Sequence, residues 1–288
     1  MKPTITELRK IASSRFKQVQ ASEKGLLSKT NTLQRKLNAF MRQVFIPSLD
    51  IDNGRIKNTN ANLLKIKKAS KLRAFLKNVI NLSLLDYYDK EFSKTQSNSI
   101  KYFNGFSPTQ AATSRISTRG NTFVDTFLDS LFENNTVFSN LQTTLRNGAT
   151  TGQRVSDLTQ LMNDQITGKG KKFGLLTSYH YNNGFNEFQD YARDLDNQFS
   201  KELNLNYAIY AGGEIKTTRH FCDEHNGKIY TREEIEDLGQ TEWQGKKDNN
   251  NIFIDAGGYN CRHNWDFISY QLAKRLRPNI ERSKYDKI

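Results

Sequence analysis

The residues best suited to binding metal gather in two short segments near the end of the sequence. Both cysteines and three of the four histidines lie between residues 219 and 263 of a 288-residue chain. The order Cys222-x2-His225, then a long gap, then Cys261-x-His263 supplies two thiolates and two imidazoles. This is a complete tetrahedral set for structural zinc. Because a Cys-x-His pair on a regular strand would point to opposite faces, we expect the backbone to turn there.

The same residues allow other arrangements. Cys222 and Cys261 could form a disulfide or remain buried thiols, and His220 could replace one of the four ligands. A disulfide needs an oxidising compartment, which two cysteines without an apolar leader segment do not indicate. The enzymatic alternative is a zinc-containing nuclease of the HNH type, with His220 or Glu224 as general base. If all four ligands bind the metal, the site is closed and structural.

Positive charge is concentrated in the first part of the sequence. The formal net charge is +13, and residues 1–80 hold 18 Lys and Arg against 4 Asp and Glu. Residues 81–288 hold 25 basic and 26 acidic side chains, so their net charge is −1. Such an excess indicates a polyanionic partner, most simply double-stranded DNA, rather than only a solvated helix face. The candidate DNA-binding side chains are Lys65, Lys67, Lys68, Lys71, Arg73 and Lys77.

Composition argues against several other classes. No run of about 18 apolar residues occurs, so the sequence predicts no membrane span. The first residues, MKPTITELRK, lack the apolar region of a secretory signal. The glycine-lysine stretch at 168–172 does not match the phosphate-binding pattern G-x4-G-K-[S/T]. With both thiols assigned to metal, no nucleophile and base pair stands out, and we expect a protein that is not an enzyme.

Apolar spacing predicts long helices before residue 206. The first, over residues 4–46, has apolar side chains every seven residues at Val19, Leu26, Leu33 and Phe40. A companion seam at Phe16, Leu37 and Val44 is interrupted by Glu23 and Thr30. This imperfect heptad suits packing on another helix, so residues 16–44 are candidates for contact with a helical partner or a second copy. Further helices are expected over residues 60–92, 122–133, 138–146, 155–166 and 173–199, with a polar loop over 93–107.

The pattern changes after Asn206. Strands are expected over residues 207–211, 228–230 and 252–254, with a short helix starting at Thr231 and a closing helix over 264–277. The fold class predicted is therefore mainly α, with an elongated helical N-terminal region and a small C-terminal α+β module. A Cys/His site, with zinc as the expected metal, staples this module. The regions expected are residues 1–105 (basic long helices), 106–205 (helical middle) and 206–288 (Cys/His module).

Two short motifs in this module carry a family resemblance. The first contains Arg219, Phe221, Cys222, His225, Gly227, Lys228 and Tyr230, and the second reads Gly258-Tyr259-Asn260-Cys261-Arg262-His263. Together they resemble the C-terminal signature of the Mu F-like phage head morphogenesis family, also called minor head or minor capsid proteins. The resemblance covers about residues 205–267, and the helical region upstream agrees only in kind.

The resemblance implies a component of the virion rather than an enzyme. We expect a structural minor head protein of a tailed bacteriophage, located at the portal vertex and acting in head assembly and DNA packaging or ejection. Its implied partners are the portal protein or the major capsid protein, and packaged double-stranded DNA bound without sequence preference. It would pass through the host cytoplasm during assembly. A plain DNA-binding protein of host origin is a further alternative.

Overall fold

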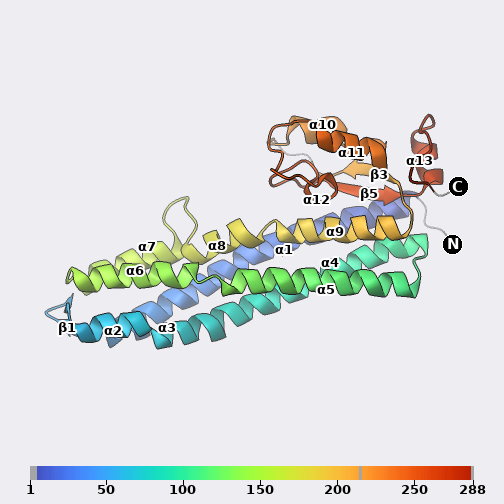
Figure 1. The fold of residues 1–288 in the computed structure, drawn as a ribbon. Coiled ribbons are helices and arrows are strands. Elements are labelled where there is room, and N and C mark those ends of the chain that lie inside the picture. Colours follow the sequence, from blue (N-terminus) through green and yellow to red (C-terminus); the bar gives the residue numbers. More distant parts are fainter. Residues whose placement is uncertain (1–4, 214–215, 287–288) are drawn as a thin grey trace. The chain divides into compact units, whose positions relative to one another are not determined.

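The computed structural model describes residues 5–213 and 216–286, which are mainly helical with a small strand region near the C-terminus (Figure 1). This confirms the mainly helical class predicted from the sequence. The elements before residue 206 are α1 (Ile5–Phe40), η1 (Met41–Phe45), η2 (Ile46–Ser48), β1 (Ile51–Asp52), β2 (Arg55–Ile56), α2 (Asn60–Lys68), α3 (Ser70–Phe75), η3 (Leu76–Asn81), α4 (Leu82–Phe103), η4 (Asn104–Phe106), α5 (Gln110–Glu133), α6 (Thr136–Thr150), α7 (Val155–Thr167), α8 (Leu175–Gly184) and α9 (Glu187–Glu202). The elements after it are β3 (Tyr207–Ala211), α10 (His220–His225), β4 (Ile229–Thr231), α11 (Arg232–Gln240), α12 (Ile252–Asp255), β5 (Asn264–Ile268) and α13 (Tyr270–Leu276).

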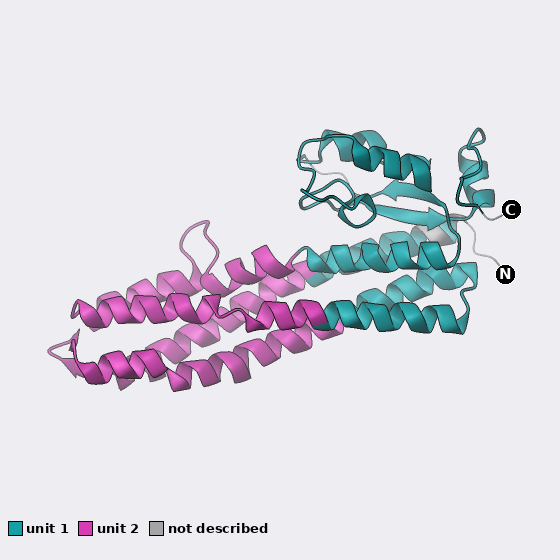
Figure 2. Cartoon of the chain, viewed as in Figure 1, with its two compact units in different colours: residues 1–22, 91–125, 186–288 teal, residues 23–90, 126–185 magenta. Residues whose placement is uncertain are grey.

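The chain forms two compact units, coloured differently in Figure 2. We call residues 1–22, 91–125 and 186–288 the Cys/His unit, and residues 23–90 and 126–185 the basic unit. The boundaries fall inside α1, α4 and α5 and between α8 and α9. The units are therefore discontinuous in sequence, and they divide the chain differently from the three consecutive regions 1–105, 106–205 and 206–288.

Within the basic unit, α8 of the same chain packs on the heptad face of α1. Leu26 and Leu33 of this face are buried. Thr30, which interrupts the apolar seam, is buried as well, and its hydroxyl accepts a hydrogen bond from Thr177 Oγ1 at 3.0 Å. The backbone N–H of Thr177 donates to Gln34 Oε1 at 2.9 Å. The predicted helix-on-helix contact is thus made within the chain, and its polar interruption at Thr30 meets a polar group on α8. Residue 4, where the helix was expected to begin, lies outside the described residues.

The single helix predicted over residues 60–92 is divided in the structure. Ala69 ends α2 in the left-handed region, with φ 37°, and its backbone N–H donates to Lys65 O at 2.7 Å. Residues 76–81 then form a π-helical stretch before α4 begins. Alanine is among the best helix formers, so its sequence carried no signal for a break at this position.

The polar loop predicted over residues 93–107 is wrong, because α4 continues through it to Phe103. Hydroxyl side chains return hydrogen bonds to carbonyls one turn earlier, as Thr95 does to Glu91 O at 3.0 Å. The predicted aromatic helix over 173–199 is also two helices, α8 and α9, separated at Phe185 and Asn186. The first prediction was wrong because it rested on polar composition. Serine and threonine hydroxyls can donate hydrogen bonds to backbone carbonyls of the preceding helical turn, so a polar segment can remain helical.

The Cys/His unit contains a three-stranded antiparallel sheet in the order β4-β3-β5. Residues 264–268, predicted as the start of a helix, form β5 and pair with β3, while the closing helix is only α13. Alternation explains the strand: Trp265 and Phe267 are buried on one face of the sheet. Residues 252–254, predicted as a strand, lie in the short helix α12, which the Asn251 side chain caps by accepting from Phe253 N. This cap outweighs the β propensity of a three-residue apolar run.

A buried histidine makes the stability of the basic unit pH-dependent. His180 on α8 is 2% exposed, and its Nδ1 lies 3.1 Å from the Tyr88 hydroxyl. Burial lowers the pKa of His180 from 6.5 to about 3. Between these two values the unfolded chain binds one more proton than the folded chain, so stability falls as pH drops. We expect His180 alone to lower the free energy of unfolding by about 2 kcal/mol between pH 7 and pH 5.

Urea unfolding of the whole chain at pH 7 and pH 5 measures this loss. The variant His180→Asn should be less stable than the unmodified chain at pH 7, and this difference in unfolding free energy should shrink by about 2 kcal/mol at pH 5. The comparison is made between variants because burial raises the pKa of Glu187 and of Asp266 to about 7, which adds an opposite pH dependence to both chains. His220→Asn, which changes an exposed histidine, is the matched control and should show the same pH dependence as the unmodified chain. An equal pH dependence in the His180→Asn variant and the unmodified chain would contradict the prediction.

Candidate metal centre and basic surface

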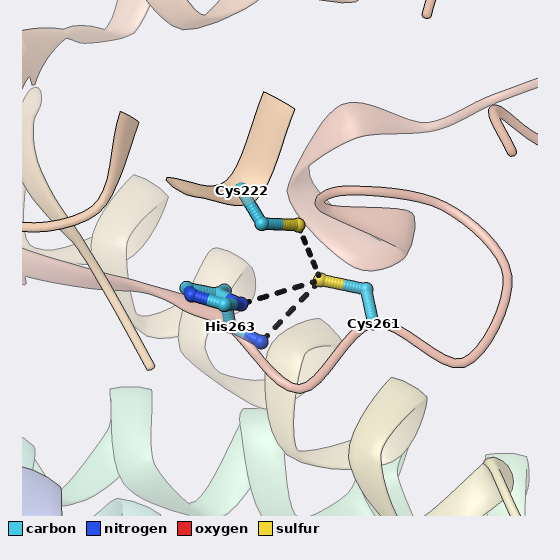
Figure 3. Close-up of side chains that lie close together, drawn as sticks. All are labelled: Cys222, Cys261 and His263. Atoms are coloured by element: carbon cyan, nitrogen blue, oxygen red, sulfur yellow. Dashed lines mark hydrogen bonds between the residues drawn. The ribbon is translucent and has the colours of Figure 1, made fainter. Parts of the chain in front are cut away.

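Three of the four predicted metal ligands meet in the Cys/His unit (Figure 3). Cys222 comes from α10, while Cys261 and His263 come from the segment between α12 and β5. Their ligand atoms all lie within 4.8 Å of one another, and the side chains are buried. The Cys222 Sγ–Cys261 Sγ distance is 3.7 Å, so both thiols are free, and Cys261 Sγ lies 3.9 Å from His263 Nδ1.

These distances fit a tetrahedral ion. With metal–sulfur bonds of about 2.3 Å, two sulfur ligands of a tetrahedral zinc lie roughly 3.8 Å apart. A sulfur and a nitrogen ligand lie about 3.5 Å apart. The observed sulfur–sulfur separation agrees with the first value, and the sulfur–nitrogen separation exceeds the second by a few tenths of an ångström. Two of the three ligand separations are therefore close to those of a tetrahedral zinc site.

The turn expected between Cys261 and His263 is present. Asn260, just before it, has φ 56°, a left-handed conformation that asparagine tolerates better than most residues. The turn directs two backbone N–H groups at the Cys261 sulfur, from Gly257 at 3.2 Å and His263 at 3.3 Å. Gly257 must lack a side chain, because a Cβ there would lie 2.3 Å from Cys222 Sγ. The glycine thus allows the backbone at residue 257 to pack directly against both sulfur atoms.

The two thiols have opposite pKa shifts. The hydrogen bond between them raises the pKa of Cys222 and lowers that of Cys261 well below its usual range. The second effect is helped by the contact with His263 and by the charge of Arg193, against the opposing effect of burial. The first thiolate of the pair therefore forms at Cys261, and the thiolate is the form that binds metal.

His225, the fourth predicted ligand, is not part of this cluster. Its Nδ1 lies 2.6 Å from the Tyr230 hydroxyl, and its ring packs against Phe221 at a centroid distance of 4.5 Å. Burial lowers the pKa of His225, so the ring is neutral near pH 7. His220, the substitute ligand and candidate base, has a side chain that is 91% exposed and lies 3.5 Å from Glu224. Neither histidine joins the two sulfurs.

The other motif residues shape the loops around the sulfurs. Arg219 donates to Gly257 O at 3.4 Å and also to Tyr259 O. Gly258 has φ +94°, and a Cβ there would lie 1.9 Å from Gly245 O, so only glycine fits. Asn260 Oδ1 accepts from Asn186 Nδ2 at 2.9 Å.

The remaining motif positions act in the same structural way. Arg262 donates to Asn186 Oδ1 at 3.3 Å, which ties the turn to the residue before α9. Phe221 stacks on Trp243 at 4.3 Å. Gly227 has φ 79° and donates its N–H to Tyr210 O at 2.7 Å, while Lys228 O accepts from Tyr210 N.

Sequence reasoning missed the guanidinium that fixes this turn. Arg193 on α9 is 3% exposed and donates to three carbonyls, those of Cys261 at 2.8 Å, His263 at 2.6 Å and Ile254 at 2.9 Å. It also pairs with Asp190 at 3.2 Å. No local pattern singled it out, because the three carbonyls lie more than 60 residues away in sequence. Tyr210, on the adjoining strand β3, was also missed and reaches both sulfurs with its hydroxyl.

The basic unit carries most of the net positive charge. It holds 19 Lys and Arg against 9 Asp and Glu, a net charge of +10 out of the +13 of the chain. The six candidate DNA-binding side chains all lie in this unit, on α2, α3 and η3, and all are exposed. Two have contacts within the protein: Lys65 donates to Ser48 O, and Arg73 lies over the Phe138 ring at 3.8 Å. The other four side chains are exposed, so their charges can interact with a partner or with solvent.

Among the described residues, no helix combines the length and apolar character needed to cross a membrane. In comparisons with known proteins, no family model matched the chain, and no curated protein or solved structure matched it either.

Proposed function

We propose that this chain is a structural minor head protein of a tailed bacteriophage, located at the portal vertex and acting in head assembly and DNA packaging or ejection. The observation that carries the proposal is the resemblance of residues 219–230 and 258–263 to the Mu F-like signature. The contacts of these residues support it, because Arg219, Asn260 and Arg262 form hydrogen bonds with neighbouring loops. Residues used to shape one turn suit a structural role.

The proposed cofactor is one structural zinc ion. Cys222, Cys261 and His263 are 3%, 4% and 2% exposed, so a substrate would have little access to a metal between them. Zinc bound there would tie α10 to the segment before β5, two parts of the chain that are about 40 residues apart. A metal ion that joins two distant segments of a small α+β region adds directly to its folding free energy.

The proposed partners follow from the two units. The basic unit, with its net charge of +10, would contact packaged DNA without sequence preference. The Cys/His unit, which holds the family motif, would bind the portal protein or the major capsid protein. The chain would be found in the virion, and in the host cytoplasm during assembly.

Purified phage particles test the proposal. Particles from cells that carry the gene are separated on a density gradient and probed with an antiserum against the chain. We expect the chain in DNA-filled heads, and we expect it to remain after a high-salt wash. Its absence from particles, with recovery on host DNA instead, would show that it is a host DNA-binding protein.

A nicking assay tests the nuclease alternative. Supercoiled plasmid is incubated with the chain and magnesium, manganese or zinc, and we expect no cleavage, because a closed site has no position for a reactive water. Nicking by the unmodified chain that disappears in the His220→Ala variant would overturn the structural proposal.

DNA binding by the basic unit should depend steeply on salt. If about six phosphates are contacted, affinity should fall roughly a thousandfold between 50 and 200 mM salt. Four of the candidate lysines, Lys67, Lys68, Lys71 and Lys77, form no side-chain hydrogen bond or ion pair with the described part of the chain, and replacing them with glutamine should weaken binding. It should also lower the salt slope by about 0.9 for each phosphate that the variant no longer neutralises.

A variant with the same reduction of charge in the Cys/His unit is the control. Lys101, Lys201, Lys228 and Arg275 are exposed side chains of that unit, and replacing them with glutamine should leave the slope unchanged. Fluorescence anisotropy with duplexes of two unrelated sequences measures both variants. Equal slopes in the two variants would show that the basic face is not the DNA-binding surface.

A further inference from the structure

The Tyr210 hydroxyl completes a triangle with the two cysteine sulfurs. Tyr210 Oη lies 3.4 Å from Cys222 Sγ and 3.6 Å from Cys261 Sγ, and the sulfurs are 3.7 Å apart. In a tetrahedral zinc site, a sulfur and an oxygen ligand lie about 3.5 Å apart, and two sulfurs lie roughly 3.8 Å apart. The three atoms thus have the spacing of one face of a coordination tetrahedron. We propose that the phenol oxygen of Tyr210 is the fourth ligand of the metal centre, in the place that the sequence assigned to His225.

The fourth vertex belongs to His263. Its Nδ1 is 3.9 Å from Cys261 Sγ, and its ring stacks on that of Tyr210 at 5.1 Å with an angle of 8° between the planes. The imidazole and the phenol ring thus lie side by side at the sulfur pair. His263 Nε2 is buried, and none of the described residues supplies it with a hydrogen-bond partner.

His225 fits the fourth position less well than Tyr210. The ring of His225 stands edge-on to that of Tyr210 at a centroid distance of 6.5 Å. His225 would have to move to reach the sulfurs, because it does not belong to the group of ligand atoms that lie within 4.8 Å of one another. Tyr210 needs no movement, since it is fully buried and β3 holds its backbone against β5.

The surroundings hold the phenol oxygen in place and offset its charge. A Cβ at Gly257 would lie 3.0 Å from Tyr210 Oη, so the glycine leaves room for the oxygen beside the sulfurs. Two thiolates and one phenolate around a divalent ion leave a net charge of −1. The buried Arg193 guanidinium, bonded to the carbonyls of Cys261 and His263, supplies a positive charge beside it. When metal binds, the proton of the phenol and those of the thiols pass to solvent.

This inference rests on the proposed zinc site, and one titration separates the two. The full chain is purified without metal and titrated with zinc while ultraviolet difference absorption is recorded. A bound tyrosinate has a characteristic difference band in the near ultraviolet. The unmodified chain should show this band, saturating at one equivalent of zinc. The variant Tyr210→Phe should lack it and should bind zinc at least about a hundredfold more weakly.

His225→Gln is the matched control and should keep both the band and the affinity. Circular dichroism of each variant before zinc is added checks that it is folded. Zinc binding without a tyrosinate band, and with unchanged affinity in Tyr210→Phe, would overturn the assignment of Tyr210 while leaving the zinc site standing. A weaker affinity in His225→Gln with the band absent throughout would return the fourth position to His225. No zinc binding by the unmodified chain would overturn the zinc site itself.

Discussion

Replacing Cys261 with serine is expected to abolish metal binding and to lower the stability of the Cys/His unit by about 4 kcal/mol when free zinc exceeds its dissociation constant a thousandfold. The physical reason is that the folded site binds zinc and the unfolded chain does not hold the ligands together. Cys261 is central to the site, since its sulfur contacts Cys222, Tyr210 and His263. Thermal unfolding of the full chain, with zinc and with a chelator, measures the difference.

The chelator separates metal from packing in this experiment. It should destabilise the unmodified chain about as much as the serine substitution does, and it should have no effect on the Cys261→Ser variant. His220→Ala, which removes an exposed histidine of the same unit, should behave as the unmodified chain does. If chelation leaves the unmodified chain unchanged, the cysteines are buried thiols that contribute only by packing.

Replacing Arg193 with methionine should cost about 3–5 kcal/mol, the usual effect of removing one partner from a buried, charge-assisted network. Methionine fills much of the volume of the side chain but leaves the carbonyls of Cys261, His263 and Ile254 buried without their donor. Lysine should not restore the stability, because it lacks the planar fork that serves several carbonyls at once. Urea unfolding measures the change in free energy.

Arg115→Met is the matched control for this substitution. Arg115 forms an exposed ion pair with Glu202 in the same unit, and removing it should cost about 0–1 kcal/mol. If the Arg193 and Arg115 variants are destabilised equally, the buried guanidinium does not hold the Cys261–His263 turn. The Arg193 variant should also bind zinc more weakly, since its ligands are no longer held in position.

Local spacing in the sequence predicted most of the Cys/His cluster. Cys261 and His263 needed a turn between them, and the structure has one, with Asn260 in the left-handed region. Because cysteine and histidine are scarce in the sequence, the proximity of Cys222 to Cys261 and His263 could also be predicted. Spacing could not predict that the Tyr210 hydroxyl, and not His225, lies beside both sulfurs, because the position of Tyr210 depends on how β3 pairs with β5. The hydrogen bonds from Arg193 to the carbonyls of the Cys261–His263 turn could not be predicted either, because they depend on where α9 packs.

The errors in the predicted fold have the same origin. Residues 264–268 form a strand because β3 offers them partners, and residues 93–103 stay helical because Phe92, Tyr102 and Phe103 are buried. Tertiary contacts of this kind outweigh local propensity, especially in short or polar segments. The excess of positive charge in residues 1–80 was visible in the sequence. The structure adds that the basic unit draws on a second segment, residues 126–185, and holds a net charge of +10.

The metal content of the purified full chain tests the metal centre most directly. Elemental analysis of protein prepared under reducing conditions with zinc in the medium should find about one equivalent of zinc per chain, as a closed four-ligand site requires. Both thiols should then be protected from alkylation until a chelator is added. Less than about a tenth of an equivalent, with both thiols freely reactive, would contradict the site, because a structural zinc of ordinary affinity survives purification.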